Sequence, residues 1–145
     1  MSTKTITSLN QLLADSFVLY TKTLNYHWHV KGPHFYPLHQ LFEEQYTDLA
    51  AAIDQIAERV VILGGQATGR MKDYLELTSI NEADDGLTPQ KMVEQLAQDQ
   101  EKIVRSCYQV IEAAQGDNDE GTTDLAVGRS RVHQKNGWML KSSVS

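Results

Sequence analysis

The chain has 145 residues, of which 41% are hydrophobic and 22% are charged, enough for one domain with a sizeable core. Its net charge of −6 argues against a general binder of nucleic acid or anionic membranes, because both require a cationic surface. A single cysteine, Cys107, excludes an internal disulfide framework, and no apolar run reaches the about 18 residues of a membrane-spanning helix. Residues 1–10 lack the pattern of a secretory signal, so we expect one cytoplasmic domain over residues 1–145.

Apolar residues recur at helical spacing through nearly the whole chain, with no convincing strand pattern. The first helix is expected to begin with a capping box formed by Ser8 and Gln11. It should end near residues 31–33, where glycine precedes proline. A second helix is expected from about Pro37 to the glycine pair at residues 64–65.

The connection that follows is long, roughly 20 residues, with a short helix expected around residues 71–75. Thr88 and Pro89 predict the N-cap and first turn of a third helix. A fourth is expected over residues 123–140, with an apolar pattern weakened by residues 128–131. Four helices with a long crossover predict an all-α, ferritin-like four-helix bundle. A purely structural bundle would have the same pattern, so topology alone does not give function.

Four of the five histidines lie between His27 and His39, and Asp54 and Glu58 follow on the second expected helix. Imidazole and carboxylate together are ligands for iron, manganese or zinc. Each residue also has an ordinary explanation. A lone His27 on an apolar face is more often a hydrogen-bonded core residue, and Asp54 with Glu58 would usually form a solvated helix face.

Helical geometry groups these residues. At about 100° per residue, His39, Glu43, Asp54 and Glu58 span about 100° of the second helix, outside its apolar stripe. His39 and Asp54 lie about 22 Å apart along a straight helix and cannot bind one ion in the same chain. Two copies packed antiparallel, with a two-fold axis between residues 48 and 49, would place His39 opposite Glu58 and Glu43 opposite Asp54. The spacing therefore predicts a symmetric dimer with two identical sites at its interface.

The intrachain alternative lacks its usual motif. Di-iron bundles of the ordinary ferritin-like kind use Glu-x-x-His within one chain. No histidine of this sequence has a glutamate three residues before it. This absence favours the site between two chains.

Residues 25–39 (NYHWHVKGPHFYPLH) and residues 54–65 (DQIAERVVILGG) closely resemble the Dps family, the small ferritins named as DNA-binding proteins from starved cells. The resemblance continues through residues 71–75 (MKDYL) and 133–140 (HQKNGWML) and covers essentially the whole chain. It implies a hollow homododecamer with ferroxidase activity. Such a protein binds two Fe(II) ions per interface site, oxidises them preferentially with hydrogen peroxide and stores the ferric mineral, which protects DNA from Fenton chemistry.

The resemblance also implies a ligand set. His27 and His39 would come from one subunit, and Asp54 and Glu58 from its two-fold partner. Glu43 stands where the family has an acidic residue near the second, weaker iron position. Zinc or another divalent metal in place of iron is the alternative occupant.

Trp28, beside His27, has two interpretations: simple packing, or the interception of oxidising equivalents that the family suggests. Tyr26 and Tyr46 are candidates for the same role, and the sequence does not rank them. His29 replaces a residue that is often Asn in the family and is not expected to be a ligand. His133 is expected to pack or hydrogen-bond near a helix end.

Residues 117–124 are acidic and predict either a solvated loop with a helix cap or, by the resemblance, a pore at the three-fold axes of a shell. Glu120 and Asp124 best match the carboxylates of such a pore, where a ring of negative charge would concentrate Fe(II). The last helix and the chain end are more polar than in the family, which leaves the helix boundaries and the robustness of the shell open.

Family members that compact DNA have a flexible basic tail. Here the two chain ends offer only Lys4 and Lys141, and twelve chains of charge −6 would carry about −72. We therefore expect weak or no direct DNA binding and no membrane association. A nucleoid-associated structural protein with a secondary metal site is the main alternative. A surface-exposed relative of the same fold and a zinc hydrolase are the others.

Overall fold

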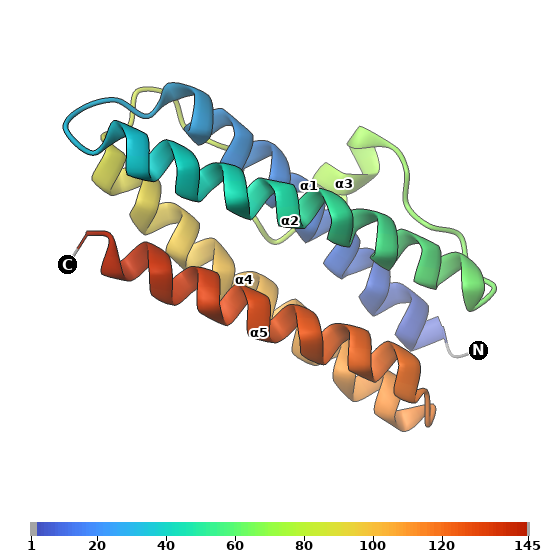
Figure 1. Ribbon diagram of the computed structural model, residues 1–145. Coiled ribbons are helices and arrows are strands. Elements are labelled where there is room, and N and C mark those ends of the chain that lie inside the picture. Colours follow the sequence, from blue (N-terminus) through green and yellow to red (C-terminus); the bar gives the residue numbers. More distant parts are fainter. Residues whose placement is uncertain (1–2, 145) are drawn as a thin grey trace.

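The computed structural model describes residues 3–144 as four long helices and one short helix. They are α1 (Thr3–His29), α2 (Phe35–Ile62), α3 (Met71–Leu77), α4 (Pro89–Gly116) and α5 (Glu120–Ser142). Helix α1 packs against α2 and α4, α4 packs against α5, and α3 lies in the crossover against α1 (Figure 1). No strand occurs within residues 3–144, so the all-α bundle with a helix-bearing crossover is confirmed. None of the described helices is both long enough and apolar enough to cross a membrane.

The beginning of α1 differs from the prediction. The helix is already formed at Thr3, so Ser8 lies inside it and its hydroxyl donates to the carbonyl of Thr5 rather than capping an end. Thr5 is fully buried, and its hydroxyl donates to the Asp117 carboxylate at 2.6 Å. This contact with the distant α4–α5 turn holds the early part of α1 in place, and local sequence cannot reveal it.

Helix α4 begins as predicted, because the Thr88 side chain accepts a hydrogen bond from the Lys91 backbone N–H and Pro89 occupies the first turn. Helix α5 begins three residues earlier than predicted because Asp119 caps it. It continues unbroken through residues 128–131, where low propensity predicted a weak helix. Burial of Arg129 against α2 outweighs that propensity.

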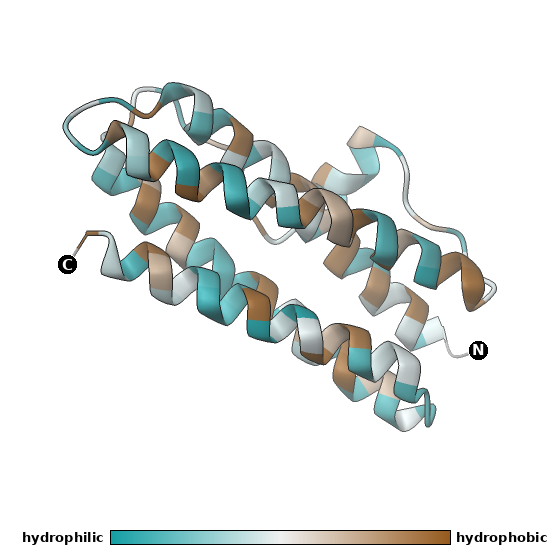
Figure 2. Cartoon of the chain, in the orientation of Figure 1, coloured by the Kyte–Doolittle hydropathy of each residue, from teal (hydrophilic) through white to brown (hydrophobic). Residues whose placement is uncertain are grey.

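The core follows the apolar stripes of the four long helices, and hydrophobic and hydrophilic residues alternate along each of them (Figure 2). On α2, Phe42, Leu49, Ile56 and Val60 are fully buried, as the helical pattern predicts. The carboxylates of that helix remain on its other side. The second predicted helix therefore has its apolar and acidic faces where the sequence places them.

A buried carboxylate attaches the crossover to the bundle. Asp15 of α1 is fully buried and accepts hydrogen bonds from the Ser106 hydroxyl of α4 and from the Ser79 backbone N–H and the Thr78 hydroxyl of the crossover. Because a buried carboxylate is costly unless its oxygens are paired, these bonds fix α3 and its flanks relative to α1 and α4.

A second buried polar contact joins α1 and α4. The Lys22 ammonium lies 2.8 Å from the Asp99 carboxylate, and both side chains are almost fully buried. Burial raises the pKa of Asp99, although Lys22 opposes the shift. A shift of α1 along α4 would separate the two groups and leave each charge without a counter-charge in the core. The pair therefore fixes the register of these helices.

Candidate metal centre

The turn between α1 and α2 brings His27 and His39 together. Helix α1 ends at His29, and a short turn containing Gly32 reverses the chain before α2 starts at Phe35. Gly32 has a φ of +112°, a conformation that side chains disfavour, so glycine suits this reversal. His27 in the last turn of α1 then stacks on His39 in the second turn of α2, with ring centroids 3.7 Å apart and an interplanar angle of 12°.

The two histidines exchange hydrogen bonds through one nitrogen each. The Nδ1 of His27 lies 2.7 Å from the His39 carbonyl oxygen, and the Nδ1 of His39 lies 2.7 Å from the His27 carbonyl oxygen. A carbonyl only accepts, so both Nδ1 atoms carry the hydrogen, and in the neutral rings both Nε2 atoms keep a lone pair. This arrangement orients both rings and leaves two nitrogen donors for an electrophile, as in metal-binding histidines whose other nitrogen is held by a carbonyl.

Glu43 completes a cluster with the two histidines. It lies one turn beyond His39 on α2, and its Oε1 is 3.9 Å from the Nε2 of His27. One ligand atom from each of the three residues lies within 4.8 Å of the others. His27 is buried, His39 is half-buried and Glu43 is exposed, so the cluster opens at the surface. Two imidazoles and one carboxylate with open positions are a donor set typical of non-haem Fe(II).

Asp54 and Glu58 are not part of this cluster. Both are exposed on α2, about four and about five turns beyond His39. Within one chain they therefore lie too far from the histidines to share an ion, as helix geometry predicts. The structure brings together His27, His39 and Glu43, and it leaves Asp54 and Glu58 on the same helix at a distance.

Tyr46, one of the three aromatic residues that the sequence offers for a redox role, contacts the cluster. The Tyr46 ring meets the His27 ring edge to face, with centroids 5.1 Å apart. Partial burial, followed by the charge of Glu43, raises the pKa of Tyr46 and favours its protonated phenol. Trp28, by contrast, is 63% exposed and makes no ring contact within residues 3–144.

His133 is a structural residue in the middle of α5, not near a helix end as predicted. It is fully buried, its Nδ1 lies 2.8 Å from the amide oxygen of Gln100, and its Nε2 lies 2.9 Å from the Arg129 guanidinium. Arg129 also binds both carboxylate oxygens of Asp48. Burial, and then the charge of Arg129, holds the pKa of His133 well below its usual range. His29 is exposed and bonded to the Asn25 carbonyl, and it does not join the cluster.

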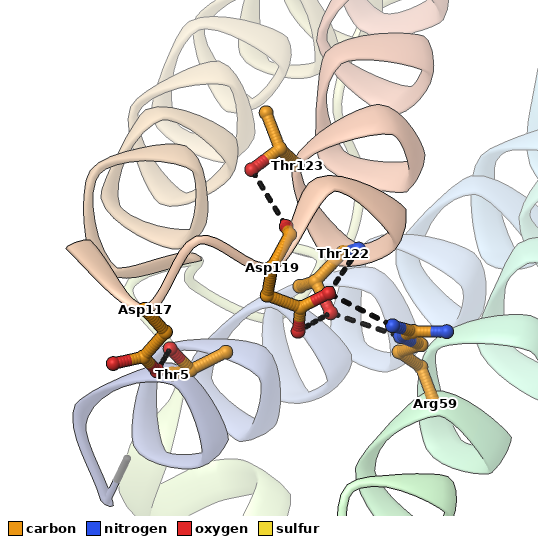
Figure 3. A network of polar contacts seen from close by, with 6 residues as sticks. All are labelled: Thr5, Arg59, Asp117, Asp119, Thr122 and Thr123. Carbon is orange, nitrogen blue, oxygen red and sulfur yellow. Dashed lines mark hydrogen bonds and ion pairs between the residues drawn. The ribbon is translucent and has the colours of Figure 1, made fainter. Parts of the chain in front are cut away.

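The acidic residues at the start of α5 divide into two groups. Asp119 accepts hydrogen bonds from Thr122 and from the Arg59 guanidinium of α2, and Asp117 accepts one from Thr5 (Figure 3). Partial burial alone would raise the pKa of Asp119, but these bonds together with the Arg59 charge lower it. Asp117 and Asp119 thus serve the fold.

Glu120 and Asp124, the predicted pore residues, form the other group. Both are exposed on the first turns of α5, and neither has a hydrogen bond or ion pair within residues 3–144. They line a shallow hollow together with Gln115 and Val127. Their carboxylates are therefore available to ions or to a neighbouring chain.

Comparison with known proteins places this geometry in a class. Residues 6–145 match the ferritin-like domain family. The bundle also superposes on the crystal structure of Dps from Staphylococcus aureus with a TM-score of 0.94 and 38% identity, over 97% of this chain and 95% of that one. The fold is thus that of a ferritin-like protein.

Two further relatives define the group within that class. The DNA protection during starvation protein 2 of Bacillus anthracis is 44% identical over 145 residues, all of this chain and 99% of that protein. A Dps structure from Vibrio cholerae, described as a member of a broad superfamily of ferritin-like diiron-carboxylate proteins, aligns with a TM-score of 0.93 and 33% identity over 98% of this chain and 89% of that one. The chain belongs to the Dps family, as the sequence motifs predict.

Proposed function

We propose that the protein is an iron-storing ferroxidase that oxidises Fe(II) with hydrogen peroxide at sites shared between two subunits. One observation supports this above all. His27 and His39 each bind a carbonyl through Nδ1, which leaves both Nε2 atoms without such a bond, and the Nε2 of His27 lies 3.9 Å from the Glu43 carboxylate. Three donors held on one side, with open coordination positions, fit a metal substrate that must also meet an oxidant.

Iron is the substrate that the donor chemistry favours. Imidazole and carboxylate suit Fe(II), and a site without thiolates does not select the softer metals. The description of the Vibrio cholerae relative as a diiron-carboxylate protein supports iron and two metal positions. Zinc binds the same types of donor, so we expect added zinc to compete with Fe(II) and inhibit its oxidation.

Asp54 and Glu58 of a two-fold partner complete the site in this proposal. His39 and Glu58 lie equally far from the point between residues 48 and 49, and so do Glu43 and Asp54. All four residues avoid the buried face of α2. Exposed Ala50 and Ala51 beside that point let two antiparallel helices approach closely. Assembly of six such dimers into a dodecameric shell would enclose the ferric product.

DNA protection follows indirectly from this chemistry. Consuming Fe(II) and peroxide removes the two reagents that form hydroxyl radicals. Direct binding to DNA is the competing function, and the Bacillus anthracis relative is named for DNA protection without stating its route. The chain's net charge of −6 opposes it, because phosphate binding depends on clustered Lys and Arg.

The first test is peroxide-dependent oxidation of Fe(II) bound without oxygen, followed by ferric absorbance. A variant combining His39→Ala, Asp54→Ala and Glu58→Ala is expected to lose about 100-fold or more of the rate. A matched control carries His34→Ala and Glu44→Ala, which are exposed residues of the same types on the same part of the chain. Equal rates in both assembled variants would remove the proposed site.

Mixed assembly tests whether the site is shared. Chains with His39→Ala and chains with Asp54→Ala plus Glu58→Ala are each expected to be inactive alone. Refolded together at equal amounts, half of the dimers contain both chains, and each such dimer has one intact site. About a quarter of wild-type activity should therefore return. No recovery would place all ligands in one chain.

A further inference from the structure

Two ion pairs join α2 to α5 in the described part of the chain. The first joins Asp48 to Arg129, and the second joins Arg59 to Asp119, each with a nitrogen–oxygen distance of 2.9 Å. About three turns of α2 separate Asp48 from Arg59, and the carboxylates proposed as partner ligands lie in that interval. The segment of α2 that carries these carboxylates is therefore attached to α5 at both ends.

Arg59 is held by two side chains at the start of α5 (Figure 3). Its Nε donates to the Thr122 hydroxyl at 2.9 Å, and its Nη2 donates to the Asp119 carboxylate at 2.9 Å. Thr122 is fully buried, only 7% of the Asp119 side chain is exposed, and the two are bonded to each other. Because the guanidinium is a rigid fork, two partners of this kind fix its orientation as well as its position.

Gly121 leaves the space that this guanidinium occupies. A Cβ atom at Gly121 would lie 2.8 Å from the Nη2 of Arg59 and 3.2 Å from its Cζ, closer than a side chain tolerates. Gly128, about two turns further along α5, has no such neighbour within 4 Å. The close approach of Arg59 to α5 therefore depends on glycine at position 121, although glycine lowers helix propensity.

Glu58, which precedes Arg59, has no side-chain support of its own. It is exposed and makes no hydrogen bond or ion pair within residues 3–144. Val60 packs into the core, but Val61 and Ile62 are 61% and 71% exposed, and α2 ends at Ile62. The backbone of this last part of α2 therefore sets where the Glu58 carboxylate lies, and Arg59 fixes that backbone on the side that faces α5.

We propose that Arg59 is a positioning residue, whose attachment to α5 holds the end of α2 so that Glu58 meets the metal bound by the histidines of the other subunit. The inference rests on the proposed function, in which Glu58 binds Fe(II) across the two-fold interface. Arg59 acts there through the α2 backbone. Groups that orient a metal ligand typically contribute about 10- to 100-fold to metal affinity, because a small displacement of the ligand weakens the bond.

Two glycine substitutions in α5 test this without removing the guanidinium. Gly121→Ala crowds Arg59, whereas Gly128→Ala places a methyl group in open space, and both raise the helix propensity of α5. Calorimetric titration of the assembled proteins with Fe(II), without oxygen, should show an affinity about 10-fold lower in Gly121→Ala than in Gly128→Ala. Equal affinities in the two variants would overturn the proposal.

Mixed assembly shows which chain carries the effect. Chains with His39→Ala supply only carboxylates to a shared site, and chains with Asp54→Ala plus Glu58→Ala supply only histidines. Arg59→Met is then added to one kind of chain or to the other. The Fe(II) concentration that gives half the maximal oxidation rate is expected to be about 10-fold higher when the carboxylate-supplying chain carries Arg59→Met than when the histidine-supplying chain does.

The outcomes separate positioning from a general contribution to stability. Both kinds of particle contain the same number of Arg59→Met chains, so a purely structural role would affect them equally. Equal values in the two arrangements would overturn the positioning role and leave the shared site in place. Absence of oxidation in mixed particles that retain Arg59 would reject the shared site and the positioning role together.

Discussion

The cluster at the α1–α2 turn and the buried His133 use the same type of side chain for opposite purposes. At the α1–α2 turn, His27 and His39 each bond one ring nitrogen to a carbonyl and keep the other available, in a cluster with the exposed Glu43. In the middle of α5, His133 has partners for both nitrogens and is fully buried. An accessible imidazole with only one nitrogen hydrogen-bonded can bind a substrate through the other nitrogen. A buried imidazole with both nitrogens hydrogen-bonded instead stabilises the bundle.

Replacing His27 at the turn and His133 in α5, one at a time, should separate these roles, with the largest effect at the turn. We expect His27→Gln to weaken anaerobic Fe(II) binding by about 100-fold, because a fixed nitrogen donor is lost. His133→Gln should leave the affinity per site unchanged in assembled protein. Calorimetric titration of both variants measures this difference. Similar losses in both would mean that the distinction between the two histidines is wrong.

Stability should respond in the opposite way. We expect His133→Ala to destabilise the fold by about 2–4 kcal/mol, because it opens a cavity and leaves Arg129 and Gln100 without a partner. The exposed His29→Ala should stay within about 0.5 kcal/mol of the wild type. Thermal melting of the assembled variants at equal concentration provides the comparison. A His133→Ala protein as stable as wild type would show that these buried bonds contribute little.

The pH dependence of stability offers a finer test of the role of the buried His133. The pKa of His133 in the folded protein lies well below its ordinary value of 6.5. The unfolded chain therefore takes up a proton below that value and the folded chain does not. This contribution is fully present above pH 6.5 and is lost as the pH falls, by up to about 1.4 kcal/mol per pH unit.

His133→Gln removes the titrating group and keeps hydrogen-bonding capacity. Its melting temperature should fall less than that of the wild type between about pH 7 and pH 5. Parallel curves for the two proteins would indicate that His133 is protonated in the folded state.

Local patterns predicted most of the fold. Thr88 with Pro89 marked the start of α4, and the apolar spacing of α2 predicted its buried face. The start of α1 and the continuity of α5 were not predictable, because each depends on a contact with a distant part of the chain. Thr5 bonds to Asp117, and Arg129 bonds to Asp48. Helix propensity alone carries no information on such pairs.

The candidate site was predictable in composition but not in its detail. Helical spacing identified His39 and Glu43, the resemblance to the Dps family implied His27, and the structure brings these three residues together. No pattern in the sequence indicates that the two rings stack and exchange bonds with each other's carbonyl groups. The contact of Tyr46 with His27 was equally hidden, because it depends on how α1 and α2 cross. Asp54 and Glu58 as partner ligands remain predictions for the dimer.

The acidic residues at the start of α5 show the same contrast between hydrogen-bonded and available side chains. The expected effect of changing them is the smallest of these predictions. Asp119 is bonded to Thr122 and Arg59, whereas Glu120 and Asp124 have no such partners within residues 3–144. We expect Glu120→Gln with Asp124→Asn to slow Fe(II) uptake a few-fold at low salt, because their charge would attract cations to a pore. The difference should vanish at high salt, where exposed charges are screened.

Asp119→Asn is the matched control for that experiment. It also removes one acidic charge, but it weakens the ion pair with Arg59 and the charge interaction with the N-terminus of α5, so we expect a loss of about 1 kcal/mol in stability. Its uptake rate should match that of the wild type at every salt concentration. Stopped-flow uptake across a salt series distinguishes the two effects. If Asp119→Asn slowed uptake as much as the double variant, general acidity of the surface, rather than the two unpaired carboxylates, would attract iron.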